Sequence, residues 1–413
     1  MQPSGAELPV ALINTIHLLT LMSEFSSLQA ELDARASDGL LRQRRLLESP
    51  QAAHIRVRGQ DLLSFCSNDY LGLASHPSLI AAMQQAAGES GTGSGASHLI
   101  TGHHAKHQAM EQALANFVGM PAALSFSTGY MANLGVVTAL MRRGDVVFAD
   151  RLNHASLNDA VVLSRADFER YRHNDMQHLA QLLQASKAPR KLVLADAVFS
   201  MDGDLAPVPE LLALCEQYDA WLMLDDAHGF GVLGQNGQGV LQHFNVQSPR
   251  IIYMATLGKA AGVAGAFIAA QQVVIDYLIQ FARTYVYTTA TPPALAGAVL
   301  AALEVIRADH ARRAHLGDLI TALKRGLASG LKSDKWSLMP SETAIQPLLV
   351  GSNEEAVWLS EYLLTQHILV PAIRPPTVPK GTARLRISLS ADHSLADVER
   401  LIAALHAAEQ ECA

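Results

Sequence analysis

Short apolar runs that alternate with segments of helical periodicity constrain the fold of this 413-residue chain more than any other feature. Continuous apolar runs of this length are typical of strands buried on both faces of a parallel sheet. The five clearest runs are residues 145–150, 191–196, 221–226, 251–255 and 266–270. Helix signals separate them, such as Pro207 to Glu210 ahead of apolar residues at helical spacing. This alternation predicts an α/β fold with a mostly parallel sheet and right-handed crossovers.

The pattern changes after about residue 300, where strands with alternating polarity appear. The expected elements are a helix at 318–331, a strand at 344–351, a helix at 353–366 and strands at 368–373 and 383–389. Alternation in the last strand predicts one solvated sheet face. A final helix begins near Ser394, a residue type that caps helices, and its apolar stripe comprises Leu395, Val398, Leu401, Ile402 and Leu405.

These patterns predict three parts of the chain. Residues 1–60 form an N-terminal extension and arm, 61–300 a large α/β domain and 301–413 a smaller α+β domain. Residues 8–22 are apolar but interrupted by polar side chains and too short to span a membrane. We interpret them as an accessory segment or as upstream translated sequence, with Met22 as the natural start.

Composition excludes several classes of protein. The net charge is −7, from 31 Lys and Arg against 38 Asp and Glu, which argues against a nucleic-acid partner and against an anionic membrane surface. Hydrophobic residues make up 49% of the chain, enough for a large core. Three widely spaced cysteines form neither a disulfide scaffold nor a metal cluster. We therefore expect a protein of a reducing compartment, the cytoplasm.

Polar side chains follow three of the apolar runs. These side chains would lie beyond the carboxyl ends of the strands, where ligands bind in a parallel sheet. The run at 221–226 delivers Asp225 and His228, the run at 191–196 leads to Ser200, and the run at 251–255 leads to Thr256 and Lys259. A carboxylate, an imidazole, hydroxyls and one amine suit a phosphorylated, nitrogen-containing aromatic cofactor bound through an imine. Pyridoxal 5′-phosphate (PLP) is bound in this way.

Nine motifs follow in an order that resembles the α-oxoamine synthases, which are fold type I PLP enzymes. The motifs are SNDYLGLASHP, GTGSGASHLITGHHAKHQAMEQALANF, FSTGYMANLGV, DRLNHASLNDAV, VFSMDGDLAPV, LMLDDAHGFGVLG, TLGKAAGVAGAF, YTTATPP and IRPPTVPKGTARLRISLSADH. The resemblance covers about residues 28 to 408. Within the family it is greatest to the branch that condenses L-alanine with a pimeloyl thioester, carried on coenzyme A or acyl carrier protein, in biotin biosynthesis. It implies a PLP-binding large domain and a homodimeric acyltransferase.

The resemblance also implies roles for residues around the cofactor ring. Lys259 matches the lysine that forms the Schiff base, and Asp225 matches the carboxylate that keeps the pyridine nitrogen protonated. His228 matches the histidine that reaches the phenolic oxygen, and Ser200 a residue beside the ring. His154 matches a histidine that stacks on the ring and meets the substrate carboxylate.

The phosphate is expected at the start of a helix that opens with Ser127 to Tyr130. Free N–H groups and the helix dipole attract anions there, and Gly129 and Tyr130 are the expected backbone donors. The resemblance adds the hydroxyl of Thr256 and, from the partner subunit, that of Thr288.

Three further residues are expected to contact substrate because they resemble family positions. Arg42 and Thr377 match contacts to the acyl substrate, and Arg374 matches the arginine that binds the amino-acid carboxylate. The alternatives are a solvated helix face for Arg42 and a rigid interdomain connection for the Pro-rich loop at 374–379.

Four other interpretations remain. Asp225 and His228 could be metal ligands, but no further ligand cluster supports a metal site, and none is predicted. The chain could instead be glycine C-acetyltransferase or 5-aminolevulinate synthase, which share the fold and cofactor. It could be a non-catalytic relative that serves as a binding subunit, although both Lys259 and Asp225 are present. A nicotinamide dehydrogenase is disfavoured because Gly91 to Gly95 follow G-x-G-x-G without a preceding strand.

Overall fold

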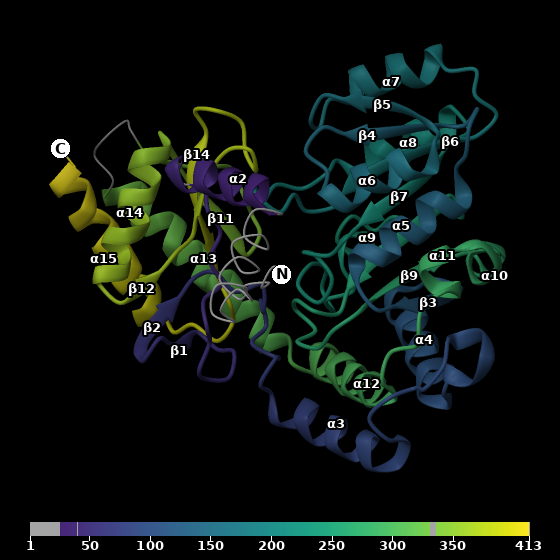
Figure 1. Ribbon diagram of the computed structural model, residues 1–413, viewed down its shortest axis with the longest axis horizontal. Coiled ribbons are helices and arrows are strands. Elements are labelled where there is room, and N and C mark those ends of the chain that lie inside the picture. Colours follow the sequence, from purple (N-terminus) through teal and green to yellow (C-terminus); the bar gives the residue numbers. More distant parts are fainter. Residues whose placement is uncertain (1–24, 39, 331–335, 413) are drawn as a thin grey trace, which may run out of the picture. The chain divides into compact units, whose positions relative to one another are not determined.

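The computed structural model describes residues 25–38, 40–330 and 336–412 (Figure 1). They form two compact units, one that ends at Leu47 and one that begins at Glu48. The first contains α2 (Ser26–Ser37), a helix with no buried residue. The apolar segment at 8–22 lies outside the described residues, and the division into domains at residues 60 and 300 stays a prediction.

The second unit contains a seven-stranded sheet, which lies on the right-hand side of Figure 1. Only β9 runs against its neighbours; the other strands share one direction, which confirms the mostly parallel sheet. The strand order is β3 (Ala122–Phe126), β9 (Ala266–Ala270), β8 (Ile251–Thr256), β7 (Trp221–Asp225), β6 (Lys191–Asp196), β4 (Val146–Asp150) and β5 (Asp167–Tyr171). All five runs predicted as strands are therefore strands of this sheet.

Both faces of this sheet are buried, as the continuous apolar runs predict. In β6, Leu192 and Leu194 belong to one apolar core, and Val193 and Ala195 belong to the other. The helices α5 (Gly129–Leu140), α6 (Ala155–Ser164), α10 (Gln272–Phe281) and α11 (Arg283–Val286) contribute to the first core. The helices α4 (Ala105–Val118), α7 (Met176–Ala185), α8 (Val208–Gln217) and α12 (Pro293–Ala308) contribute to the second.

The remaining elements of this region are short or peripheral. A π-helical turn, η1 (His98–Gly102), lies between α3 (Pro77–Ser90) and α4 in the chain, and α9 (Val240–His243) follows β7. The helix predicted at 318–331 begins earlier, as α13 (His310–Gly330).

The C-terminal region is built on an antiparallel sheet of β10 (Ser337–Leu338), β11 (Ile345–Gly351), β14 (Ala383–Ser388) and β13 (Ala372–Ile373). The predicted helices are present as α14 (Asn353–Thr365) and α15 (Leu395–Cys412). The Ser394 hydroxyl accepts the Asp397 N–H, which confirms the predicted cap. Leu395 is 50% exposed, so the predicted apolar stripe begins only at Val398.

Two predictions for this region are wrong. The single strand expected at 368–373 is divided: β12 (Ile368–Leu369) joins β1 (His54–Val57) and β2 (Gln60–Ser64) in a separate sheet, whereas β13 pairs with β14. Pro371 separates the two pieces, since proline cannot donate to a ladder. The expected solvated face of β14 does not exist, because all six of its residues are buried. The guanidinium groups of Arg384 and Arg386 on that face bond to residues 200–202 instead.

None of the helices in the described ranges is both long and apolar enough to cross a membrane.

Candidate active site

A cavity of about 210 Å³ lies where β6, β7 and β8 end and α5 and α6 begin. This is the edge at which parallel sheets bind their ligands. The cavity is lined by eight of the predicted site residues: Gly129, Tyr130, His154, Ser200, Asp225, His228, Thr256 and Lys259.

Lys259 extends from the turn after β8 into this cavity. Its Nζ lies 2.8 Å from Nε2 of His228. Burial lowers the pKa of Lys259 to about 8, against the opposing pull of the Asp225 and Asp196 carboxylates. The amine is therefore far easier to deprotonate than an ordinary lysine, as a nucleophile or base requires.

Asp225 is the last residue of β7, and its side chain is held at two points. Asn133 of α5 donates its amide N–H to Oδ2 over 2.8 Å, and the Ala227 N–H donates to Oδ1 over 3.1 Å. The carboxylate thus keeps a fixed orientation at the cavity wall. A buried carboxylate favours a protonated nitrogen placed beside it.

A second carboxylate, Asp196 at the end of β6, lies directly beside Asp225 in the sheet register. Burial, followed by repulsion from Asp225, raises the pKa of Asp196 well above its usual range. Both its oxygens face the backbone N–H of His154, at 3.2 and 3.3 Å. Asp196 therefore anchors the start of α6, where His154 lines the cavity as an exposed side chain.

A hydrogen-bonded chain leads away from Lys259. His228 Nδ1 lies 2.6 Å from the Tyr70 hydroxyl, which donates to Asn68 Oδ1 over 3.1 Å. Arg386 Nη2 donates to the same Asn68 oxygen over 3.2 Å. Burial lowers the pKa of His228 well below its usual range, and the charges of Lys259 and Arg386 add to this effect. The imidazole is consequently neutral.

The other end of the cavity is built from the first turn of α5. Thr128 caps this helix, since its Oγ1 accepts the Met131 N–H over 3.1 Å. The N–H groups of Gly129 and Tyr130 lack helical partners at this position and attract anions. Thr256 lies at the end of β8, where its Oγ1 donates to the Gly265 carbonyl over 3.0 Å.

These groups fit a PLP molecule. A helix N-terminus suits the phosphate, a buried carboxylate suits the pyridine nitrogen, and an amine with a lowered pKa suits the aldehyde carbon. Asn133 Oδ1 lies next to these groups and is buried without a hydrogen-bond partner. It can therefore accept a hydrogen bond from a bound ligand.

The comparison with family models supports the same fold. The model described as "Aminotransferase class I and II" matches residues 60–405. An 8-amino-7-oxononanoate synthase of Methylobacillus flagellatus is 62% identical over 384 residues, which cover 93% of this chain and 96% of the relative. The chain belongs to the 8-amino-7-oxononanoate synthase family. A second member, from Nitrosospira multiformis, is 59% identical with the same coverage of both chains.

Solved structures of related enzymes are also similar to this member of the 8-amino-7-oxononanoate synthase family. A structure of serine palmitoyltransferase (SPT) with PLP has a TM-score of 0.87 at 30% identity and covers 95% of this chain and 98% of that one. An 8-amino-7-oxononanoate synthase of Francisella tularensis has a TM-score of 0.72 at 30% identity, over 85% of this chain and 98% of that one. These matches confirm the fold type I architecture.

Four predicted residues do not line the cavity. Arg374 and Thr377 lie in the loop after β13, where the Thr377 N–H donates to the Arg374 carbonyl over 3.0 Å. Thr288, expected to act in a partner subunit, follows α11 and is half-buried. Arg42 belongs to the first compact unit. The roles of all four stay predictions.

Six further residues in or next to the site were not predicted from the sequence: Asn68, Tyr70, Asn133, Ser156, Asp196 and Arg386. Asp196 carried a signal, because it ends an apolar run as Asp225 does. The Tyr70 and Arg386 contacts carried none. Tyr70 is 158 residues from His228, and Arg386 is 186 residues from Ser200, whose carbonyl accepts its Nε–H over 2.5 Å.

Proposed function

We propose that this chain catalyses the PLP-dependent decarboxylative condensation of L-alanine with a pimeloyl thioester. The products are 8-amino-7-oxononanoate, carbon dioxide and the free thiol carrier, within biotin biosynthesis. The observation that carries the proposal is the placement of Lys259, His228 and Asp225 around one cavity. The names of relatives up to 62% identical support the choice of reaction within the fold.

The chain's own residues would hold the cofactor at several points. Lys259 would bind it covalently through Nζ, Asp225 would keep the pyridine nitrogen protonated, and the start of α5 with Thr256 would bind the phosphate. His154 would cover one face of the ring, with Ser200 and His228 near its substituents. When bound, PLP supplies an electron sink for the carbanion formed at the amino-acid α-carbon.

Lys259 is the base of this proposal. Its pKa of about 8 leaves part of the amine neutral near neutral pH, so Nζ can accept the α-proton of alanine and later return a proton. A protonated amine can only donate, and His228 Nε2 lies 2.8 Å away to accept that hydrogen bond. His228 Nδ1 then donates to Tyr70, so the imidazole keeps one tautomer.

Two arginines are candidates for the alanine carboxylate. Arg374 is the one that the family resemblance implies. Neither Arg374 nor Arg386 lines the cavity, but Arg386 contacts Ser200, which does. Arg386 is 5% exposed, bonds to the Ser200 carbonyl, and has no carboxylate within ion-pair distance in the part of the chain that the structure describes. Buried guanidinium groups are normally paired. We therefore assign the alanine carboxylate to Arg386, with His154, and leave Arg374, Thr377 and Arg42 to the acyl substrate.

We propose that the enzyme is a homodimer and acts in the cytoplasm. Ile100 and Tyr287 are 75% and 74% exposed, and a bridge between Ser97 and Thr289 brings their segments together. If a second subunit covered this patch, Thr288 of the first subunit would lie close to the active site of the second. Three widely spaced cysteines support a reducing compartment.

A panel of amino acids and thioesters tests the function. Alanine, glycine and serine are each combined with pimeloyl, acetyl, succinyl and palmitoyl thioesters, on coenzyme A and on acyl carrier protein, and products are identified by mass spectrometry. We expect turnover with alanine and a pimeloyl thioester to exceed that of every other pair. Preferred use of glycine with acetyl or succinyl thioesters, or of serine with palmitoyl thioesters, would refute the assignment.

A further inference from the structure

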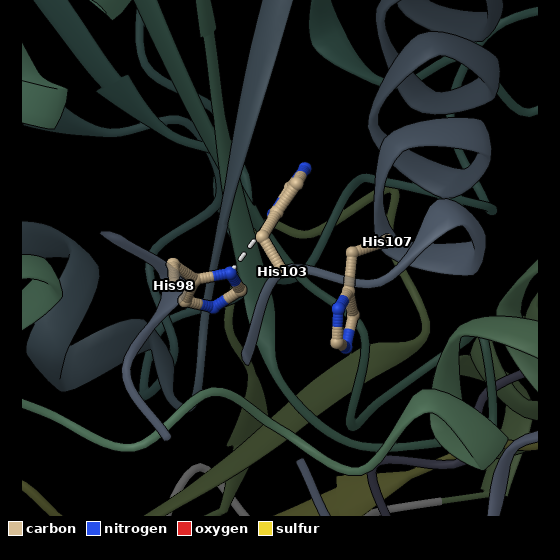
Figure 2. A group of neighbouring side chains, drawn as sticks. All are labelled: His98, His103 and His107. Carbon is tan, nitrogen blue, oxygen red and sulfur yellow. Dashed lines mark hydrogen bonds between the residues drawn. The ribbon is translucent and has the colours of Figure 1, made fainter. Parts of the chain in front are cut away.

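Outside the candidate active site, three histidines converge where η1 and α4 meet (Figure 2). His98 begins η1, His107 lies in the first turn of α4, and His103 lies between the two elements. One nitrogen of each ring lies within 4.8 Å of the others. Among the described ranges, this is the single cluster of His, Cys, Asp or Glu side chains with the spacing of metal ligands.

We propose that His98, His103 and His107 bind a zinc ion. Zinc accepts three histidine ligands and then keeps a fourth position for water. Its Zn–N bonds of about 2.0–2.1 Å place two tetrahedral nitrogens about 3.3 Å apart. Nδ1 of His98 and Nδ1 of His103 are 3.0 Å apart, so these rings need to separate by only a few tenths of an ångström. The ligand nitrogen of His107 lies within 4.8 Å of the other two and would have to move inward to reach the ion.

The second nitrogens of two rings already have the partners that ligand histidines use. Nε2 of His103 faces Gln108 Oε1 at 3.3 Å and the buried carboxylate of Glu111 at 3.9 Å. Nε2 of His107 faces the Thr291 carbonyl at 2.9 Å. Metal-bound histidines characteristically donate their other N–H to a carboxylate or a carbonyl, which fixes the tautomer and orients the ring.

The other contacts of the rings are compatible with a bound ion. His98 stacks on Tyr285, with ring centroids 4.7 Å apart and planes at 14°, which holds its ring in place. Nδ1 of His107 accepts the His104 N–H over 3.0 Å, and zinc would replace this hydrogen bond. A cavity of about 340 Å³ lined by His98, His103, Glu111 and Tyr285 gives an ion access to the cluster.

A zinc ion here would cross-link η1 to the start of α4, next to a second segment that η1 already touches. The Ala290 N–H donates to the Ala96 carbonyl over 3.0 Å, and a bridge links Ser97 with Thr289. Because all three ligands lie within residues 98–107, the ion would fix η1 relative to the start of α4, and the His107–Thr291 hydrogen bond would connect them to the second segment. None of the three histidines lines the candidate active site, so the inference stands or falls separately from the proposed reaction.

The experiment uses the full chain without an affinity tag, loaded with PLP and stripped of metals by a chelator. Equilibrium dialysis measures Zn²⁺ binding, and the visible absorption of added Co²⁺ reports its coordination. The variants His98→Ala and His103→Ala remove ligands, and His243→Ala, an exposed histidine of α9, is the matched control. Thermal unfolding with and without Zn²⁺ gives a second readout.

We expect one Zn²⁺ per chain, a tetrahedral Co²⁺ spectrum and a higher Tm with zinc. His98→Ala and His103→Ala should each weaken binding at least about tenfold, whereas His243→Ala should leave it unchanged. Equal zinc affinity in all four proteins would overturn the proposal. If a ligand variant does not fold, X-ray absorption of the Co²⁺-loaded native chain decides, and fewer than two imidazole ligands refutes the site.

Discussion

At the scale of single residues, burial sets the chemistry of the candidate active site. The same low-polarity surroundings lower the pKa of Lys259 to about 8, lower that of His228 and raise that of Asp196. Each shift favours the uncharged form, as desolvation requires. The site therefore offers a reactive amine and a neutral imidazole near neutral pH.

Loading of the stripped enzyme with PLP should depend on pH through Lys259, because only the neutral amine attacks an aldehyde. Below its pKa of about 8 the neutral fraction rises tenfold per pH unit, and above that value it levels off. We expect the loading rate, followed by visible absorption in a stopped-flow instrument, to bend near pH 8. Lys259→Ala should give no covalent band at any pH. A bend above pH 10 would mean that the lysine is not desolvated.

Matched substitutions distinguish the proposed roles of Arg386 and Arg374. Arg386→Lys should raise the KM for alanine about 10- to 100-fold, because an ammonium cannot make the paired hydrogen bonds of a guanidinium to a carboxylate. Arg374→Lys should instead raise the KM for the pimeloyl thioester. Steady-state kinetics with each substrate varied in turn provides the measurement. The reverse pattern would return the carboxylate to Arg374.

At the scale of elements, strand ends and one helix start build the site. The strands β6, β7 and β8 deliver Asp196, Asp225 and Thr256, and α5 presents its free N–H groups to the same cavity. Parallel strands end at one edge of a sheet, so residues far apart in sequence meet there. The capped start of α5 adds the anion-binding end.

Removal of the α5 cap should weaken both folding and phosphate binding. Thr128→Ala deletes the oxygen that accepts the Met131 N–H, and loss of such a cap costs about 1 kcal/mol. We expect urea unfolding to show this loss, together with weaker PLP binding. Thr128→Ser keeps the oxygen and should behave like the native chain. Equal stability of the Ala and native proteins would show that the cap contributes nothing.

At the scale of the whole molecule, the proposed dimer gives the unplaced Thr288 a role. Thr288 does not line the cavity of its own chain, and in the proposed dimer its hydroxyl would serve the partner's phosphate site. Exposed Ile100 and Tyr287 nearby supply apolar surface for the contact.

Complementation tests this arrangement. Lys259→Ala and Thr288→Glu should each abolish activity, because one lacks the reactive amine and the other places a negative charge against the phosphate. Subunits exchanged between the two variants form mixed dimers with one intact site. Activity should then recover to about a quarter of the native value, since half the dimers are mixed and each has one of two sites. No recovery despite demonstrated exchange would contradict a shared site.

Sequence alone determined five of the seven strands of the large sheet, the order of the motifs and the residues around Lys259. Apolar periodicity and strand-end residues are local properties, so they can be recognised without knowledge of the tertiary structure. Tertiary structure alone decided that β14 is buried, that Arg386 reaches Ser200 and that Tyr70 meets His228. It also decided that three histidines near α4 face one another. Such contacts join segments packed from distant parts of the chain, and no local pattern encodes which side chains will meet.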